Sequence, residues 1–311
     1  MKKLNAIFMG TPDFSVPSLD LLNNHPQINL KTVISMPDRP AGRGQTLKSP
    51  EVIDYAKKNK INFFQTENIN KETEFINELE KENIDIVIVL AFAQFLGNKI
   101  LSLPKVGCFN IHTSLLPKYR GAAPIQYALL NGDKTTGVSI QKMVKKMDAG
   151  DLVISSPLDI GNEENGGLLY TRLKYQAALS LNELILLVDA GKLTYTPQNE
   201  ENVSFAPTLK KNDGFLNFKE ETFEQIKNKI RALDPWPGTF CFLDKKRLKV
   251  FSIFKSTEKL APGEVFVSNN SFFIGCKDQS LELIDVQLEG KKKSQMASLL
   301  NGLKKEITIN P

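Results

Sequence analysis

The stretch Ile84-Asp85-Ile86-Val87-Ile88-Val89-Leu90 decides which kind of fold this chain can adopt. Its β-branched residues favour extended backbone. A strand that is apolar on both sides is typical of a sheet that helices cover on both faces. We therefore expect residues 84–90 to form a central strand of an α/β sheet.

Outward from this strand, strand-like and helix-like patterns alternate through residues 1–190. Short apolar segments predict further strands at residues 4–8, 30–34, 107–111, 137–143 and 152–158. Apolar residues at helical spacing predict helices at residues 14–22, 51–58, 71–82, 122–131 and 168–190. This alternation predicts a mainly parallel, Rossmann-like sheet in a three-layer α/β domain.

The pattern changes after residue 190. Residues 191–207 show no clear periodicity, and we interpret them as a linker. A helix at residues 223–233 precedes short strands predicted at residues 239–242, 248–253, 263–267, 271–275 and 281–286. Short strands at regular spacing predict a small β-barrel similar to the oligonucleotide-binding (OB) fold. The expected domains are therefore residues 1–190 and 208–311.

Composition indicates a soluble protein from a reducing compartment. The longest apolar stretch, residues 84–96, is shorter than the ~20 residues that span a bilayer. The apolar segment after the amino-terminal lysines is too short for a secretory signal. Three cysteines without a CxxC pair predict neither disulfides nor structural zinc. We expect a cytoplasmic protein with no membrane partner.

Charge is unevenly distributed along the chain. Residues 1–207 contain 22 Lys and Arg against 22 Asp and Glu, whereas residues 208–311 contain 18 against 13. The net charge of +5 therefore comes from the last third. Two interpretations stay open, a solubilising surface or a face for an acidic polymer such as RNA.

The strongest candidate site is the pair Asn110 and His112, at the end of a predicted strand. Residues two apart in a strand point to the same side, and ligands of such sheets bind beyond the carboxyl ends of the strands. An amide and a protonated imidazole can both donate hydrogen bonds to an oxyanion on an attacked carbonyl. A carboxylate would support the imidazole, and Asp148 is the first candidate, with Asp151 second. Either aspartate could instead only shape its turn.

Three other segments have competing interpretations. The loop from Gly10 to Asp13 could hold an anion or cap a helix, but it lacks the spacing of dinucleotide- and ATP-binding loops. Residues 36–50 form an unusually long loop for the connection between a strand and a helix. The basic residues of this loop could contact phosphates, or the loop could be a disordered surface segment. Ser114 is a weak candidate nucleophile because no GxSxG motif surrounds it.

Several segments together carry a resemblance to one family. They are Met9-Gly10-Thr11-Pro12-Asp13-Phe14, residues 37–44, residues 110–124, Met147-Asp148-Ala149-Gly150-Asp151 and Asp234-Pro235-Trp236-Pro237. With these motifs the chain closely resembles the methionyl-tRNA formyltransferase family. The resemblance implies transfer of the formyl group of 10-formyltetrahydrofolate to the α-amino group of methionine on initiator tRNA. It implies no metal, a formyltransferase-type catalytic domain and a tRNA-binding carboxy-terminal domain, and we expect a monomer.

The resemblance also assigns roles to residues. It implies Asn110, His112 and Asp148 as the catalytic positions. The implied folate-binding positions are Ser114, Leu115, Leu116, Pro117, Leu90 and Phe92. The implied tRNA-binding positions are Arg39, Arg43 and Lys48, in the loop that would reach the acceptor end of the tRNA.

Two residues depart from the family's pattern, and rival functions share much of it. Thr113 and Ala93 stand where smaller residues are expected, so both could reshape the folate pocket. Glycinamide ribonucleotide formyltransferases share the Asn-x-His pattern, but they end after one domain. Formyltransferases that act on sugar amines keep the same site, and a non-catalytic tRNA-binding protein could keep the same fold.

Overall fold

The computed structural model describes residues 3–42, 44–268, 270–300 and 308–310 of the 311-residue chain. The chain forms two compact units. The first unit comprises Met1–Pro124, Thr135–Asp159 and Tyr170–Ala206. The second unit comprises Ile125–Lys134, Ile160–Leu169 and Pro207–Pro311.

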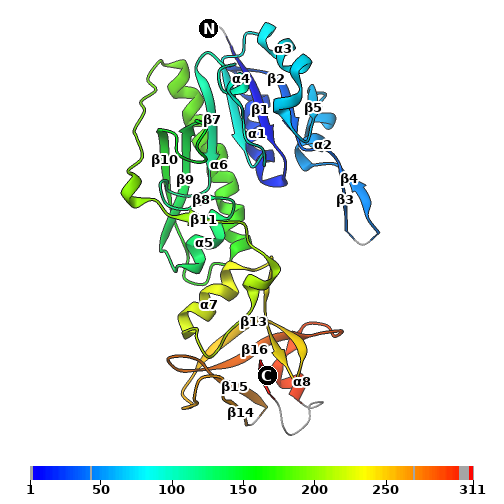
Figure 1. Cartoon of the computed structure of the whole chain (residues 1–311), viewed down its shortest axis with the longest axis vertical. Coiled ribbons are helices and arrows are strands. Elements are labelled where there is room, and N and C mark those ends of the chain that lie inside the picture. Colours follow the sequence, from blue (N-terminus) through cyan, green and yellow to red (C-terminus); the bar gives the residue numbers. More distant parts are fainter. Residues whose placement is uncertain (1–2, 43, 269, 301–307, 311) are drawn as a thin grey trace. The chain divides into compact units, whose positions relative to one another are not determined.

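A mainly parallel sheet forms the centre of the first unit (Figure 1). Its strands are, in sheet order, β10 (Leu152–Asp159), β9 (Thr135–Lys142), β7 (Gly107–His112), β6 (Ile86–Leu90), β1 (Leu4–Gly10), β2 (Ile28–Ser35) and β5 (Phe63–Gln65). The pairs from β7 to β5 are parallel, whereas β9 pairs antiparallel with both β7 and β10. The predicted α/β fold class is confirmed.

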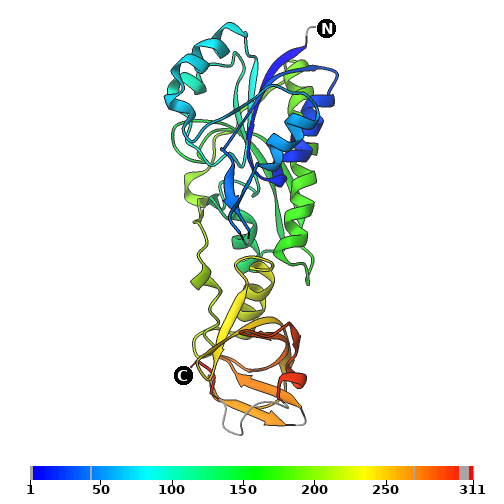
Figure 2. The ribbon, with the colours of Figure 1, turned by 90° about the vertical axis from the view of Figure 1, so that its right-hand side faces the viewer.

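Helices cover both faces of this sheet (Figure 2). They are α1 (Val16–Asn24), α2 (Glu51–Lys58), α3 (Thr73–Lys81), α4 (Asn98–Leu101) and α6 (Gly166–Asp189). On one face, Ile76 of α3 and Ile100 of α4 pack with Val87 and Val89 of β6. Every residue of β6 is buried, as expected for a central strand enclosed by helices. The buried Cys108 of β7 belongs to the same core.

Residues 36–50 differ from the prediction of a loop without regular structure. They form a hairpin of β3 (Arg39–Ala41) and β4 (Thr46–Lys48). Gly42, Gly44 and Gln45 have positive φ angles, which permit the chain to reverse between the two strands. The hairpin could not be predicted from the sequence because proline and glycine argue against a strand. The short elements β5 and α4 were likewise not predicted.

The second unit is built around an antiparallel sheet. The sheet has the order β12 (Thr239–Leu243), β13 (Lys246–Ser256), β16 (Ser280–Leu288), β15 (Ser271–Gly275) and β14 (Val265–Ser268), and β17 (Ser294–Gln295) pairs with β16. Helix α7 (Phe223–Ala232) packs on this core through Ile226 and Ile230, next to the buried Cys241 and Cys276. The remaining α-helices are α5 (Pro124–Leu130) and, among the described residues near the carboxyl terminus, α8 (Met296–Leu300). Among the described residues, no helix has both the length and the apolar character that a bilayer crossing requires.

Candidate active site

Asn110 and His112 lie at the carboxyl end of β7, where the register of the sheet fixes their neighbours. Asn110 is opposite Gln141 of β9, and His112 is opposite Ser139. The neighbouring strands β6 and β1 are parallel to β7, so their carboxyl ends open on the same edge of the sheet. The structure therefore places both residues at the edge where ligands of such sheets bind.

Asp148 comes to the same place from the turn between β9 and β10. Its Oδ1 accepts hydrogen bonds from Asn110 Nδ2 at 3.3 Å and Gln141 Nε2 at 3.1 Å. Its Oδ2 accepts a hydrogen bond from the backbone N–H of Gly121 at 2.9 Å and lies 3.7 Å from His112 Nδ1. The structure thus brings Asn110, His112 and Asp148 together. Asp151 is exposed, which favours Asp148 as the carboxylate beside His112.

The His112 ring has an oxygen atom near each of its nitrogens. Nε2 lies 2.9 Å from the carbonyl oxygen of Tyr119. A carbonyl only accepts, so Nε2 donates this bond, and the neutral ring then has no proton on Nδ1. A second proton on Nδ1 would face the Asp148 carboxylate. The His112 side chain is only 7% exposed, so both oxygens face the ring in a largely buried site.

The turn from Ser114 to Pro117 follows His112 directly and is held by the hydroxyl of Ser139. This hydroxyl accepts a hydrogen bond from the Leu116 N–H at 3.0 Å and donates one to the Ser114 carbonyl at 2.8 Å. Ser114 is fully buried, and its own hydroxyl donates to the Lys118 carbonyl at 2.6 Å. Because this hydroxyl supports the turn, the geometry argues against Ser114 as a nucleophile.

Leu90 and Phe92, the other expected folate contacts, lie at the end of β6. Each residue is only 2% exposed, so neither side chain is open to a ligand in this structure. The hydroxyl of Ser15 donates to the Leu90 carbonyl at 2.7 Å. Ala93 has a φ angle of 66°, in the left-handed region that favours glycine. Thr113 does not have a positive φ angle, so its backbone conformation accommodates a side chain without strain.

Arg39 and Lys48, both expected to contact tRNA, are exposed on the β3–β4 hairpin. They are cross-strand partners in the hairpin register. Lys48 forms an ion pair with Glu51 at the start of α2. Arg43, the third expected contact, lies outside the described residues. The structure therefore places Arg39 and Lys48 beside each other and away from the core.

Two glutamines beside Asp148 were missed by the sequence analysis. Gln141 donates to the Asp148 carboxylate and, through Oε1, accepts from the Gly150 N–H at 2.9 Å. Gln198 donates to the backbone carbonyls of Asp148 at 3.0 Å and Gly150 at 2.7 Å. Gln141 meets Asn110 only through the pairing of β9 with β7, which no local sequence pattern specifies. Gln198 lies in the segment interpreted as a linker, which likewise carries no signal.

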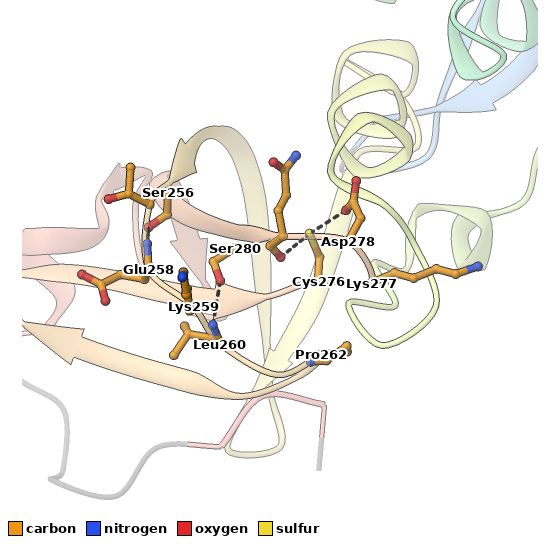
Figure 3. A pocket seen from close by; sticks show the side chains of 11 residues that line it. Ser256, Glu258, Lys259, Leu260, Pro262, Cys276, Lys277, Asp278 and Ser280 are labelled. Carbon is orange, nitrogen blue, oxygen red and sulfur yellow. Dashed lines mark hydrogen bonds between the residues drawn. The ribbon is translucent and has the colours of Figure 1, made fainter.

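A separate hollow of about 530 Å³ lies in the second unit (Figure 3). Residues 256–260, Pro262 and residues 276–280 line it, and no predicted site residue is among them. Its polar groups bond largely to one another. The Leu260 N–H donates to the Ser280 hydroxyl at 3.2 Å, and Cys276 Sγ lies 3.4 Å from Asp278 Oδ1.

Comparison with known proteins establishes the family. Residues 2–185 match the model of the formyl transferase family, and residues 208–304 match that of the formyl transferase C-terminal domain. A methionyl-tRNA formyltransferase from Geobacter metallireducens is 38% identical over 310 residues, covering 99% of each chain. The chain belongs to the methionyl-tRNA formyltransferase family. A further member, from Agathobacter rectalis, is 38% identical over 96% of each chain.

Solved structures share the fold at lower identity. An N-formyltransferase from Helicobacter canadensis has a TM-score of 0.65 and 20% identity over 91% of this chain and 99% of its own. HypX from Aquifex aeolicus has a TM-score of 0.63 and 16% identity, with 98% of this chain covering 49% of that protein. The fold of this member of the methionyl-tRNA formyltransferase family therefore recurs in proteins whose sequences have diverged widely from it.

Proposed function

We propose that this chain transfers the formyl group of 10-formyltetrahydrofolate to the α-amino group of methionyl initiator tRNA. The observation that carries the proposal is the Asp148 carboxylate, which binds the Asn110 amide and faces His112 at the edge of the sheet. Full-length similarity to methionyl-tRNA formyltransferases supports this acceptor over a small amine such as glycinamide ribonucleotide.

The chemistry follows from the three side chains. The α-amine attacks the formyl carbon, and the carbonyl oxygen becomes an oxyanion. The Asn110 amide has two N–H groups and uses one on Asp148, so the other can donate to the oxyanion. His112 Nδ1 lies 3.7 Å from Asp148 Oδ2, too far for a hydrogen bond between them, so a proton on Nδ1 can donate to the oxyanion while the carboxylate balances the charge of the imidazolium.

Collapse of this intermediate completes the transfer. The bond between the formyl carbon and N10 of the folate breaks after the new carbon–nitrogen bond has formed. The attacking amine loses one proton and N10 gains one, so the reaction has no net proton change. Asp148 is placed to relay this proton through water, because its carboxylate lies beside Asn110 and His112, the two side chains that donate to the oxyanion.

The remaining expected contacts extend the proposal to both substrates. The turn from Ser114 to Pro117 and the backbone at Leu90 and Phe92 bind the folate. Arg39 and Lys48 of the hairpin, together with Arg43, contact the acceptor end of the tRNA, and residues 208–311 form a tRNA-binding domain whose excess of basic residues attracts phosphates. We further propose a monomer that acts in the cytoplasm.

The first test is the choice of acceptor. Purified protein, 10-formyltetrahydrofolate and initiator tRNA charged with methionine should give formylmethionyl-tRNA, detected by mass spectrometry of the released amino acid. The matched reactions contain uncharged initiator tRNA or glycinamide ribonucleotide, and neither should be formylated. Formylation of glycinamide ribonucleotide in place of the tRNA would overturn the assignment of the acceptor.

A further inference from the structure

Arg120 is a charged side chain in an unusual environment, since it is only 1% exposed. A buried charge is costly unless it is paired and hydrogen-bonded. The guanidinium meets this requirement through Gln198 Oε1, at 2.8 Å from Nη2, and Glu200 Oε1, also at 2.8 Å from Nη2. Hydrogen bonds from Arg120 and then Lys146 lower the pKa of Glu200 to about 2, so this partner is charged at neutral pH.

The amide nitrogen of Gln198 connects this pair to the turn that carries Asp148. It donates to the carbonyls of Asp148 and Gly150, while the amide oxygen accepts from Arg120. Asp148 itself has a φ angle of 50°, in the left-handed region that aspartate adopts more often than most side chains but still at a cost in free energy. The hydrogen bonds of Gln198 are well placed to offset that cost.

The backbone on either side of Arg120 contacts the other two groups of the site. The Tyr119 carbonyl accepts from His112 Nε2, and the Gly121 N–H donates to Asp148 Oδ2. This short segment, β8 (Arg120–Gly121), pairs in parallel with β11 (Phe205–Ala206). Residues 198–206 therefore contact both the segment that binds His112 and the turn that carries Asp148.

We propose that Arg120 and Gln198 are positioning residues for the formyl transfer, acting through the turn that carries Asp148. Arg120 fixes the orientation of the Gln198 amide, because a guanidinium can donate only to the oxygen. The oriented amide then presents its N–H groups to the two turn carbonyls. This fixes the Asp148 carboxylate between Asn110 and His112. The inference rests on the proposed function, because it concerns the rate of the same reaction.

The test compares Gln198→Ala and Gln198→Glu with the control Glu201→Ala, an exposed residue of the same segment. Displacing a catalytic group by about 1 Å can cost roughly 100-fold, so we expect Gln198→Ala to lower kcat by ~10- to 100-fold. Both KM values should stay within about threefold, because neither substrate touches Gln198 in this proposal. Gln198→Glu keeps the partner of Arg120 but places oxygen against the turn carbonyls, so its kcat should fall equally.

Two measurements separate positioning from general destabilisation. In an Asp148→Asn background, Gln198→Ala should cause little further loss, because both changes act through one group. Hydrogen exchange of the peptide covering residues 144–151 should be faster in Gln198→Ala and unchanged in Glu201→Ala.

Wild-type kcat in Gln198→Glu, additive losses in the double variant, or unchanged exchange of the turn would each overturn this inference. These outcomes leave the proposed function intact as long as the wild-type protein formylates methionyl-tRNA. An inactive wild-type protein would instead contradict the proposed function itself.

Discussion

At the scale of single residues, His112 shows how its neighbours determine what a side chain can do. The Tyr119 carbonyl and the Asp148 carboxylate face its two nitrogens and hold the ring in one orientation. The other histidine, His25, follows α1, and its Nδ1 accepts a hydrogen bond from the Gln27 N–H at 3.3 Å. The two residues therefore form a natural comparison within one chain.

We expect His112→Ala to lower the rate of formyl transfer by roughly 100- to 1,000-fold, about 2.7–4 kcal/mol, because it removes an oxyanion donor. His25→Ala should retain the wild-type rate. The measurement is single-turnover transfer at saturating folate and tRNA. A His112→Ala rate within a few-fold of wild type would exclude the proposed role of the imidazole.

Some residues of the site could be predicted from the sequence and others could not, for a physical reason. Asn110 and His112 could be predicted because a strand end and a two-residue spacing are local features. Asp148 was identified because glycine beside it marks a tight turn. Arg120 and Gln198 are 78 positions apart and meet only through tertiary packing, so no local pattern indicates their contact.

At the scale of elements, the turn between β9 and β10 depends on a glycine. A Cβ atom added to Gly150 would lie 1.7 Å from the Lys142 carbonyl oxygen, closer than any real contact. Because that oxygen belongs to the backbone of β9, the turn would have to move. The same turn carries Asp148, so stability and activity are coupled here.

Gly150→Ala should therefore destabilise the chain by about 1–3 kcal/mol and also reduce formyl transfer. The control is Gly161→Ala, whose Cβ would lie 3.3 Å from the Glu164 Cβ and no closer than 4.0 Å to a backbone atom, so it should cost clearly less than Gly150→Ala. Urea unfolding followed by circular dichroism gives the stabilities, and the transfer assay gives the rates. Full activity in Gly150→Ala would show that Asp148 does not require this turn geometry.

Elements with strong periodicity were predicted best. The helix expected at residues 51–58 is α2 (Glu51–Lys58), and the strand expected at residues 271–275 is β15 (Ser271–Gly275). The β3–β4 hairpin was missed because each of its strands has only three residues, β3 contains a proline, and glycines lie between the two strands. Cross-strand hydrogen bonds hold such an element together, and a local sequence pattern does not show them.

At the scale of the whole molecule, basic residues should determine how strongly the affinity for tRNA depends on salt. Each phosphate contact releases counterions, so affinity falls as salt rises. Lys48→Ala and Arg43→Ala should each lower the slope of log Kd against log salt by about one if they contact phosphates. Lys81→Ala, an exposed lysine of α3, is the matched control and should leave the slope unchanged. Unchanged slopes for both variants would remove Lys48 and Arg43 from the interface.

The burial of the three cysteines has a practical consequence. Burial raises the pKa of the Cys108 and Cys241 thiols to about 12, and it also raises that of Cys276. The reactive thiolate is therefore scarce at neutral pH, and alkylating reagents reach these sulfurs slowly. A cysteine introduced at exposed Lys48 could then carry a fluorophore on the natural background, with no native cysteine replaced, and report the arrival of tRNA in real time.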